Sequence, residues 1–550
     1  MQSSNTTSMG QHGAFASLLP LAMRDDLESF SDSSTEFNGL QTPKSVQFPT
    51  TSTFVEPSDV GEQLQYVSAD EVSLVRRIQL QIARSNSSVD NSRPPKDRFL
   101  STVTLLALSF FAVGSGPEGG EAVIIAAGPL LGLIALVVFP VVYFFPMAFM
   151  VTELVGAIPE AGGHAYWVAL AFGPTWGLQA GFWAWLGNCM HCAAYASIGI
   201  KAIYQVAKWE HMPVLEYTMR AGLSMLLALP SFFHLRFVSY AAGSLIAFIL
   251  FPFVLVAVWS AVKAGKWEEL SVIPDVAMKS KNSELSYSNL IGALVWNFNG
   301  IQNLSVFAKC VLDPARTFRR VMLISLGLVP LSYLVPILPV IALSTPDWTT
   351  WTGSGSAIFN AGKHLGGPIC IVWVTVASLV CDAGLYIGGL LCSVFLACGM
   401  AEKGFAPFSL RFSGLARPNA HGIDHSVIFC SLAIILIVVT ISIKDMILIS
   451  NALSGLETMV LIVAAVRLRV TMPDLPRSTY LCGQSHTWLM VAALVVPLIV
   501  SGFVVVWAFT ELIPAALTGV FLFSGIIYSL QSDLKDFRQT YVPVRTIETT

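Results

Sequence analysis

The stretch Gly114-Ser-Gly-Pro-Glu-Gly-Gly-Glu121 interrupts an otherwise apolar run that extends from residue 100 to residue 126. Four glycines and a proline weaken a helix, and the proline also removes one backbone hydrogen bond. In a membrane, non-helical backbone of this kind is tolerated only where it lines a cavity or is buried in protein. The stretch therefore predicts a broken helix at a functional site. A simple kink, or a close helix contact through small residues, is the alternative.

The sequence on both sides of this stretch has the composition of a membrane protein. Of the 550 residues, 54% are hydrophobic and 12% are charged, whereas a soluble domain is about 25% charged. Leu130–Met150, Leu245–Val262 and Val427–Ile443 contain no charged residue. Each is long enough to cross a ~30 Å hydrocarbon layer as a helix. This composition excludes a soluble enzyme, a secreted disulfide scaffold or a nucleic-acid-binding protein as an interpretation of the whole chain.

From Phe99 onward the hydropathy pattern predicts an all-α membrane protein with twelve transmembrane helices. Together they form a predicted transmembrane domain over residues 99–531. The expected spans are 100–126, 129–155, 174–204, 217–234, 237–263, 287–311, 321–343, 367–400, 426–443, 446–468, 487–509 and 511–531.

The segments outside the spans carry most of the charge and indicate the orientation. Residues 1–98 are rich in Ser and Thr and lack a long apolar stretch, which predicts a disordered tail, and residues 532–550 form a second tail. Basic residues gather before the first span and in the loops that follow even-numbered spans, for example at Arg316, Arg319 and Arg320. The positive-inside rule then places both termini in the cytoplasm.

A second, weaker interruption lies in the sixth predicted span, at Asn297-Phe-Asn-Gly300. Paired interruptions in corresponding helices of two halves are the best sequence-level indication of a transporter's binding site. Unwinding frees backbone groups, so that the N-terminus of a half-helix can meet a carboxylate and free carbonyls can meet a cation. We therefore expect a substrate site formed by Gly114, Ser115, Gly116, Asn297, Phe298, Asn299 and Gly300.

Six motifs follow one another along the chain: GSGPEGGEAVIIAAGPLL at 114–131, PEAGGHAYW at 159–167, FGPTWG at 172–177, WNFN at 296–299, GMAEKG at 399–404 and VRLR at 466–469. In this order they resemble the amino acid–polyamine–organocation (APC) transporter superfamily over roughly residues 100–510, and in particular its eukaryotic polyamine/proton symporter branch. The resemblance implies a leucine-transporter-like fold with two inverted five-helix repeats, residues 99–263 and 287–468, followed by two extra helices in 487–531. It also implies alternating access around a central site, and proton-coupled movement of amino acids or polyamines.

The chain departs from this branch at several acidic positions. A site with few acids holds a polycation poorly, because each buried ammonium group needs a partner. A zwitterionic substrate therefore fits better than a polyamine, with its carboxylate at the amides of Gly114–Gly116 and its amine at the carbonyls of the sixth span. According to this resemblance, the chain keeps one acidic residue of the branch, Glu121. At the other acidic positions of the branch, this chain has Met147, Gln302, Cys310, Ile387 and Leu461.

The remaining intramembrane acids are candidate functional residues, because burying them is costly. Glu118 and Glu121 follow the first break, where the helix dipole favours negative charge. Both are candidates for binding the substrate amine, and Glu118 also for binding a proton; a structural cap is the alternative. His191, Asp382 and Glu457 are candidates for ion or proton coupling. For His191, a helix–helix hydrogen bond is the stronger alternative.

Other polar and aromatic residues have simpler interpretations. Glu153 and Lys309 lie near the ends of their spans, which favours loop anchoring or snorkelling. Trp296 and Phe298 either gate the site or pack as aromatic core. The motif Cys189-Met-His-Cys192 lacks a second ligand pair, so packing residues are expected there and no metal site.

The expected function is that of a secondary active transporter for amino acids or polyamines, driven by H⁺ or Na⁺. The sequence has no catalytic motif and no nucleotide-binding loop, so an enzyme, an ATP-driven pump and a cofactor are not expected. The expected partners are a small-molecule substrate and the lipid bilayer, with no nucleic acid. The plasma membrane is the usual location of the superfamily. The alternative is a transporter-like nutrient sensor that signals through the N-terminal tail.

Overall fold

The computed structural model describes residues 98–531, with gaps at 115, 208, 210–211, 274–285, 352–355 and 406–420, and at 474, 476, 478, 482, 484 and 485. The predicted C-terminal tail, the predicted N-terminal tail up to residue 97, and the candidate site residue Ser115 therefore lie outside the described residues. What the sequence predicts for them stays a prediction.

The described residues form helices and no β-strand, and the chain is helical within each of the twelve predicted ranges. How many of these helices cross the membrane stays a prediction. The helix α6 occupies a segment that the hydropathy pattern leaves as a loop. The elements are α3 (Thr102–Val113), α4 (Gly119–Phe139), η3 (Pro140–Phe144), α5 (Phe145–Ala157), α6 (Gly163–Phe172), α7 (Pro174–Ala207), α8 (Pro213–Ala228), η4 (Leu229–Phe232), α9 (Leu235–Lys263), η5 (Trp267–Ser271), α10 (Tyr287–Phe298), η6 (Ile301–Cys310), α11 (Pro314–Leu343), η7 (Trp348–Thr350), α12 (Ser356–Glu402), α13 (His421–Thr440), α14 (Ile443–Thr471), α15 (Thr487–Ala508) and α16 (Leu512–Gln531).

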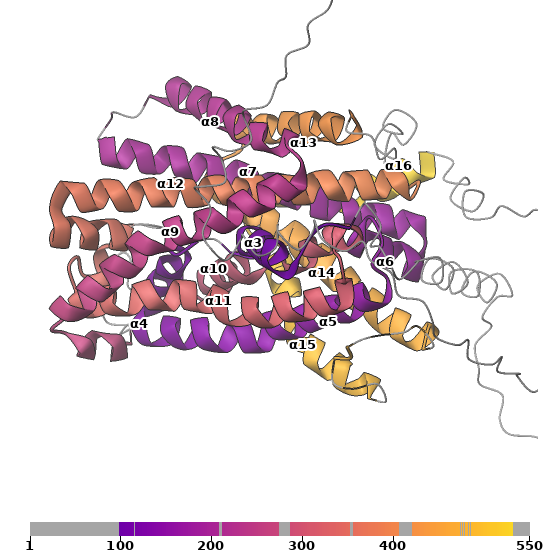
Figure 1. Cartoon of the computed structure of the whole chain (residues 1–550), viewed down its shortest axis with the longest axis horizontal. Coiled ribbons are helices and arrows are strands. Elements are labelled where there is room, and N and C mark those ends of the chain that lie inside the picture. The colour runs from indigo at the N-terminus through magenta and orange to yellow at the C-terminus, as the bar shows by residue number, and fades with distance from the viewer. Residues whose placement is uncertain are drawn as a thin grey trace, which may run out of the picture. The chain divides into compact units, whose positions relative to one another are not determined.

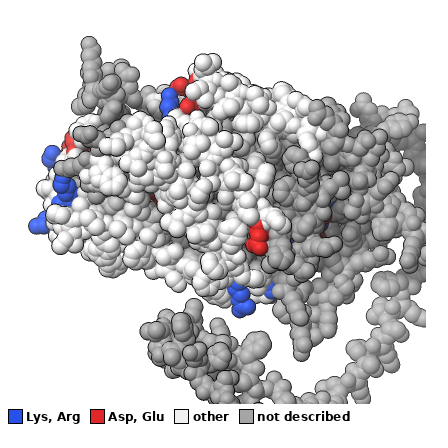
Figure 2. Space-filling view, turned by 90° about the horizontal axis from the view of Figure 1, so that it is seen from above, with Lys and Arg blue, Asp and Glu red and all other residues white. Residues whose placement is uncertain are grey.

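Long apolar helices identify the chain as an integral membrane protein. Large apolar side chains such as Phe251 and Leu436 are exposed on the outer helices, and an extensive apolar surface marks contact with a membrane. Most of the surface shown in Figure 2 is uncharged. In the described part of the chain, six helical stretches are long and apolar enough to span a bilayer: Gly119–Ala157, Leu235–Lys263, Pro314–Leu343, Ser356–Glu402, Ile443–Thr471 and Thr487–Ala508.

The first predicted helix break is confirmed between α3 and α4. Between these helices Gly116 has φ +79°, in the left-handed region that favours glycine. A Cβ atom here would lie only 2.8 Å from Sγ of Cys381 in α12. Both the backbone conformation and the close packing therefore require glycine at this position.

The second predicted break is confirmed between α10 and η6, where Asn299 and Gly300 are non-helical. Gly300 has φ +101°, and a Cβ atom on it would lie 2.8 Å from the carbonyl oxygen of Ala112 in α3. The two breaks are far apart in the sequence, and this short distance shows that they lie against each other in the fold.

Long helices enclose the two breaks. The helix α7 packs along α12 and α14, and α11 packs against α3 and α4 (Figure 1). Buried aromatic rings fill the space beside α10, where the ring of Phe298 contacts those of Phe139, Phe144 and Tyr333. The breaks are therefore in the interior of the protein, where non-helical backbone can line cavities.

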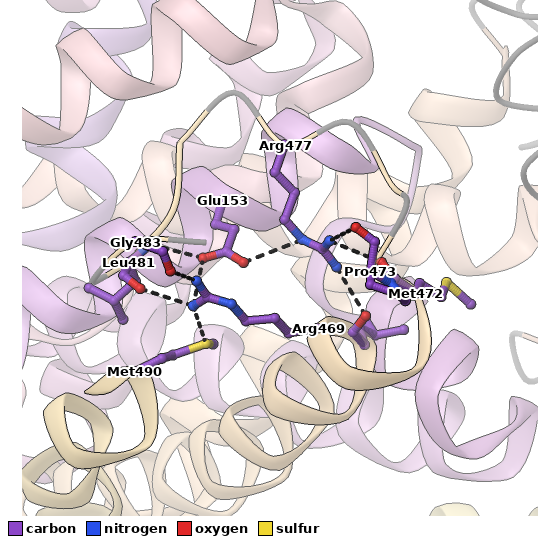
Figure 3. A network of polar contacts seen from close by, with 9 residues as sticks. Glu153, Arg469, Met472, Pro473, Arg477, Leu481, Gly483 and Met490 are labelled. Carbon is purple, nitrogen blue, oxygen red and sulfur yellow. Dashed lines mark hydrogen bonds and ion pairs between the residues drawn. The ribbon is translucent and has the colours of Figure 1, made fainter. Parts of the chain in front are cut away.

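A buried cluster of charges joins the end of α5 to the end of α14 and the loop that follows (Figure 3). Glu153 lies 3.5 Å from Nη1 of Arg469 and 3.3 Å from Nε of Arg477. It also accepts a hydrogen bond of 3.0 Å from the backbone N–H of Leu481. Glu153 thus anchors the loop after α14, which is one of the two roles expected for it. Lys309, for which the same two roles are expected, pairs with Glu402.

Candidate functional site

A small cavity lies directly after the first break, and we call it the acidic cavity. The start of α4 contributes Glu118 and Gly119 to its lining, and α12 contributes Asp382. The opposite side is formed by α7 and α10, which contribute Tyr195, Ile198, Trp296 and Asn297. The cavity therefore brings together two of the predicted acids and one residue of the second break.

The two carboxyl groups of this cavity are not fully satisfied within the protein. Glu118 is 8% exposed, and its carboxylate is hydrogen-bonded to Ser378 of α12. Its Oε1 atom, like Oδ2 of Asp382, is buried without a hydrogen-bond partner. Among the described residues, no Lys or Arg forms an ion pair with either group. A buried carboxylate in this condition is costly, so the cavity is suited to a cation from outside.

A second small cavity lies at the breaks themselves, and we call it the polar cavity. Gly114, Asn299 and Gly300 line it, which places three of the predicted site residues together. Amide and imidazole side chains complete the lining, from Asn188 and His191 of α7 and from Asn303 of η6. Tyr195 and Trp296 line both cavities. These two aromatic residues therefore separate the acidic cavity from the polar cavity.

Hydroxyl and amide groups satisfy the backbone that the breaks set free. Tyr195 donates its hydroxyl to the carbonyl oxygen of Gly114 at 3.3 Å. Tyr333 donates its hydroxyl to the carbonyl oxygen of Asn297 at 2.9 Å. The side chain of Asn297 donates to the carbonyl oxygen of Gly119 at 2.8 Å and so ties α10 to α4. These side-chain hydrogen bonds join neutral groups, and each is weak enough to be exchanged.

His191 joins the site to α14. Its Nδ1 atom lies 2.8 Å from the hydroxyl of Ser450 and 3.1 Å from the carbonyl oxygen of Gly187. Its ring also packs on Trp296, with 4.4 Å between the ring centroids. The helix–helix hydrogen bond expected as the alternative is therefore present. The predicted role in proton transfer is untested by these contacts.

Glu121 lies outside the lining of both cavities and is fully buried. Its two carboxylate oxygens accept hydrogen bonds from the first turn of α12, from the backbone N–H groups of Ala357 (3.0 Å) and Ile358 (3.1 Å) and from the hydroxyl of Ser356 (3.3 Å). A carboxylate that accepts from the first N–H groups of a helix acts as its cap. The structural cap considered from the sequence is therefore the arrangement seen, and substrate binding by Glu121 stays a prediction.

Three further predicted residues are buried away from the cavities. Phe298 belongs to the aromatic cluster beside α10 and lines neither cavity, whereas Trp296 lines both. Gly116 packs on Cys381. Glu457 of α14 is 1% exposed and accepts a hydrogen bond of 2.9 Å from Gln302 of η6.

Sequence reasoning missed several polar residues at or beside the breaks: Tyr195, Tyr333, Asn188 and Asn303. The available signal was a polar side chain inside an apolar span, as with Asn188 one turn before His191. Their partners lie on other helices, so their hydrogen bonds were not visible in the sequence.

Apolar helices, paired breaks and internal polar cavities place the chain in the class of polytopic membrane proteins. Within that class, the chain belongs to the amino acid permease family, whose profile matches residues 100–530. The predicted membership of the APC superfamily is thereby confirmed, and it supports a transport function.

Relatives of the chain include plant proteins. A probable polyamine transporter of Arabidopsis thaliana is 28% identical over 399 residues, which cover 70% of this chain and 78% of the relative. Polyamine transporter PUT1 of Oryza sativa subsp. japonica is 28% identical over 393 residues, which cover 70% of each chain. Polyamine transporter RMV1 of Arabidopsis thaliana is 27% identical over 310 residues, or 56% of this chain and 61% of the relative.

Proposed function

We propose that the chain is a secondary active transporter whose substrate binds through an amine in the acidic cavity. The observation that carries this proposal is the meeting of Glu118 and Asp382 in one cavity, where the described residues supply no cationic partner. Buried acids without partners are costly, and they mark substrate or ion pathways in membrane proteins. A substrate ammonium group relieves this cost by pairing with both carboxylates.

The transport cycle proposed for this site is alternating access around the two broken helices. The breaks at Gly114–Gly116 and Asn299–Gly300 lie against each other and line or adjoin the cavities, which supports this cycle. Tyr195 and Trp296 stand between the cavities and would move as the substrate passes. For this cycle we assign the helices to two inverted five-helix repeats, residues 99–263 and 287–468. The repeats belong to a leucine-transporter-like fold with twelve spans. Residues 487–531 form two extra helices, both termini are cytoplasmic, and the protein belongs to the plasma membrane.

For the substrate we propose an amino acid zwitterion. The acidic cavity contains Glu118 and Asp382, whereas the lining of the polar cavity contains no acid and presents the side chains of Asn188, Asn299 and Asn303. A molecule with one ammonium end and a neutral or anionic remainder matches this distribution of charge. A polyamine is the second candidate because the relatives are named polyamine transporters. Polyamines carry an ammonium group at each end, and the second end would meet no carboxylate in the polar cavity.

The test of the function is uptake by purified protein in proteoliposomes. Labelled neutral, basic and acidic amino acids are compared with putrescine and spermidine, with and without a pH gradient and with Na⁺ replaced by choline. We expect saturable uptake of an amino acid that is driven by the pH gradient. Saturable uptake of putrescine alone would contradict the zwitterion proposal, and the absence of uptake for the whole panel would contradict the proposed function.

A further inference from the structure

A second buried acid, Glu457 of α14, lies in a polar cluster that belongs to neither cavity. Its Oε2 atom accepts a hydrogen bond of 2.9 Å from the side-chain amide of Gln302 in η6. Its Oε1 atom lies 3.7 Å from Nε2 of His164 in α6. Both Oε1 and Nε2 are buried and have no hydrogen-bond partner at this distance. The carboxyl and imidazole groups are therefore aimed at each other in a site from which water is excluded.

The hydrogen bonds of His164 determine which ring nitrogen faces Glu457. Its Nδ1 atom lies 3.2 Å from the backbone carbonyl oxygen of Gln302 and 3.1 Å from the hydroxyl of Ser305. A carbonyl oxygen can only accept, so Nδ1 carries the hydrogen of the neutral ring. Nε2 is then an acceptor, and it faces a carboxylate oxygen that is also an acceptor. Two acceptors in this position repel each other unless one proton lies between them.

The described helices that pack against α14 offer no Lys or Arg close enough to take the place of that proton. The helices α10, α15 and α16, which pack against α14, contain no Asp, Glu, Lys or Arg. In α7 the only Asp, Glu, Lys or Arg is Lys201. It lies about four turns from Gly187, the point at which α7 packs on Ser454 of α14, and is therefore far from Glu457. His191 of α7 is bonded to Ser450, about two turns before Glu457.

The elements nearest to the pair contribute one further titratable group. In η3, Tyr143 lies close enough to Glu457 for the two groups to interact electrostatically. The η6 helix contributes the neutral side chains of Gln302 and Ser305, and its Lys309 lies two turns farther on, paired with Glu402. Within the described residues, Glu457, His164 and Tyr143 are therefore the titratable groups of this cluster.

The cluster is connected to the polar cavity through a single side chain. Gln302 donates its amide to Glu457 and also lies 3.3 Å from the side-chain oxygen of Asn299, which lines that cavity. Gln302 is the second residue of η6, immediately after the break at Gly300. When the proton leaves, the carboxylate binds the Gln302 amide more strongly, because a hydrogen bond to a charged acceptor is about twice as strong as a neutral one. This change acts on the residue next to the second break.

We propose that Glu457 and His164 form the site of the proton whose movement is coupled to substrate transport. This inference rests on the proposed function, since it names the coupling ion of the same transporter and the residues that hold it. The proton is carried by the carboxyl group of Glu457 or by Nε2 of His164, which face each other at 3.7 Å. Its release changes the Glu457–Gln302–Asn299 connection to the polar cavity. Glu118 and Asp382 are left to bind the substrate amine.

The transport test compares the wild-type protein with Glu457→Gln in proteoliposomes. We expect the variant to lose accumulation driven by a pH gradient, while it keeps exchange of labelled for unlabelled substrate, which requires no net proton movement. His164→Gln is expected to shift the pH of half-maximal uptake, which a merely structural role would leave in place. Glu511→Gln, which removes an exposed carboxylate paired with Lys444, is the matched control and should behave as wild type.

A measurement that does not depend on transport tests the proton site itself. Infrared spectra of the purified full-length protein are recorded through a pH titration in H₂O and in D₂O. We expect a carboxyl carbonyl band that shifts in D₂O and is absent from Glu457→Gln, and Glu457→Asp should move the band instead of removing it. If wild type and Glu457→Gln have the same spectra, or if the variant still accumulates substrate with the gradient, the inference is wrong. If the band is present but the wild type transports nothing, the proton site stands and the proposed function fails.

Discussion

Glu153 and the pair Glu118–Asp382 are buried carboxylates that differ in whether a cationic side chain lies beside them. Glu153 has two guanidinium partners, Arg469 and Arg477, which also donate to backbone carbonyls (Figure 3). Glu118 and Asp382 share a cavity, and the described residues give them no cation. A fully paired buried charge holds the structure together, whereas an unpaired one leaves a position for a ligand. The comparison therefore distinguishes a carboxylate with a structural role from carboxylates that we propose to bind substrate.

The two arginines of the Glu153 cluster depend on the carboxylate between them. Burial lowers the pKa of the Arg477 guanidinium, and the adjacent Glu153 carboxylate acts in the opposite direction. Removal of Glu153 would leave both cations buried beside each other. This cluster should therefore show the largest effect of any single substitution on stability.

Glu153→Ala is expected to lower the free energy of unfolding by about 3–5 kcal/mol, because it leaves uncompensated buried charge. Denaturant titration of the purified protein in mixed micelles measures the loss. Replacement of all three residues by apolar ones, as Glu153→Leu with Arg469→Met and Arg477→Met, should recover most of it. A triple variant less stable than Glu153→Ala would show that the ion cluster itself contributes more than its apolar replacement.

Glu118→Gln and Asp382→Asn are expected to leave stability intact or improved, since each removes an unpaired buried acid. Each should nevertheless raise the KM for the transported amine about 10- to 100-fold, because a hydrogen bond to a charged group is worth about 1.5–3 kcal/mol. Initial rates of uptake in proteoliposomes measure the change. An unchanged KM in both variants would place the substrate amine elsewhere.

Tyr333→Phe should have a smaller effect. It removes the hydroxyl that satisfies the carbonyl of Asn297 at the end of α10, and a neutral hydrogen bond contributes about 0.5–1.5 kcal/mol. We expect uptake to change by about two- to tenfold, through the ease with which the second break rearranges. A change in maximal rate with KM unaltered would support this role, whereas a change in KM alone would indicate direct contact with substrate.

Glu511→Gln should have the smallest effect of the series. The Glu511–Lys444 pair is exposed, and pairs of this kind contribute about 0–1 kcal/mol. Neither unfolding nor uptake is expected to change measurably. A loss comparable to that of Glu153→Ala would mean that burial is not what distinguishes the two ion pairs.

The helix breaks could be predicted from the sequence because their causes are local. Glycine and proline weaken a helix wherever they occur, and Gly116 and Gly300 have the positive φ angles that favour glycine. The same chemistry marks two other borders. Gly128 (φ +75°) lies between the first two predicted spans, and Gly367 (φ +64°) begins the eighth. At each of these glycines a kink separates two helical segments, so that residues 356–366 of α12 form a segment of their own before the predicted span.

The partners of the acids could not be predicted, because they depend on contacts between distant helices. Glu118 and Glu121 are equivalent in the sequence, since both follow the first break. One turn of helix directs Glu118 to the acidic cavity and Glu121 to the start of α12. Likewise, nothing local to Glu457 indicates that His164 faces it while Glu153 receives two arginines.

The cap formed by Glu121 also makes the start of α12 a reporter on the first broken helix. Three donors in the first turn of α12 are hydrogen-bonded to one carboxylate of α4, so a movement of α4 is passed directly to the start of α12. Lys363, two turns farther along α12, is exposed. A spin label or fluorophore attached at that position follows the movement of α4 from outside the substrate pathway, without occupying either cavity.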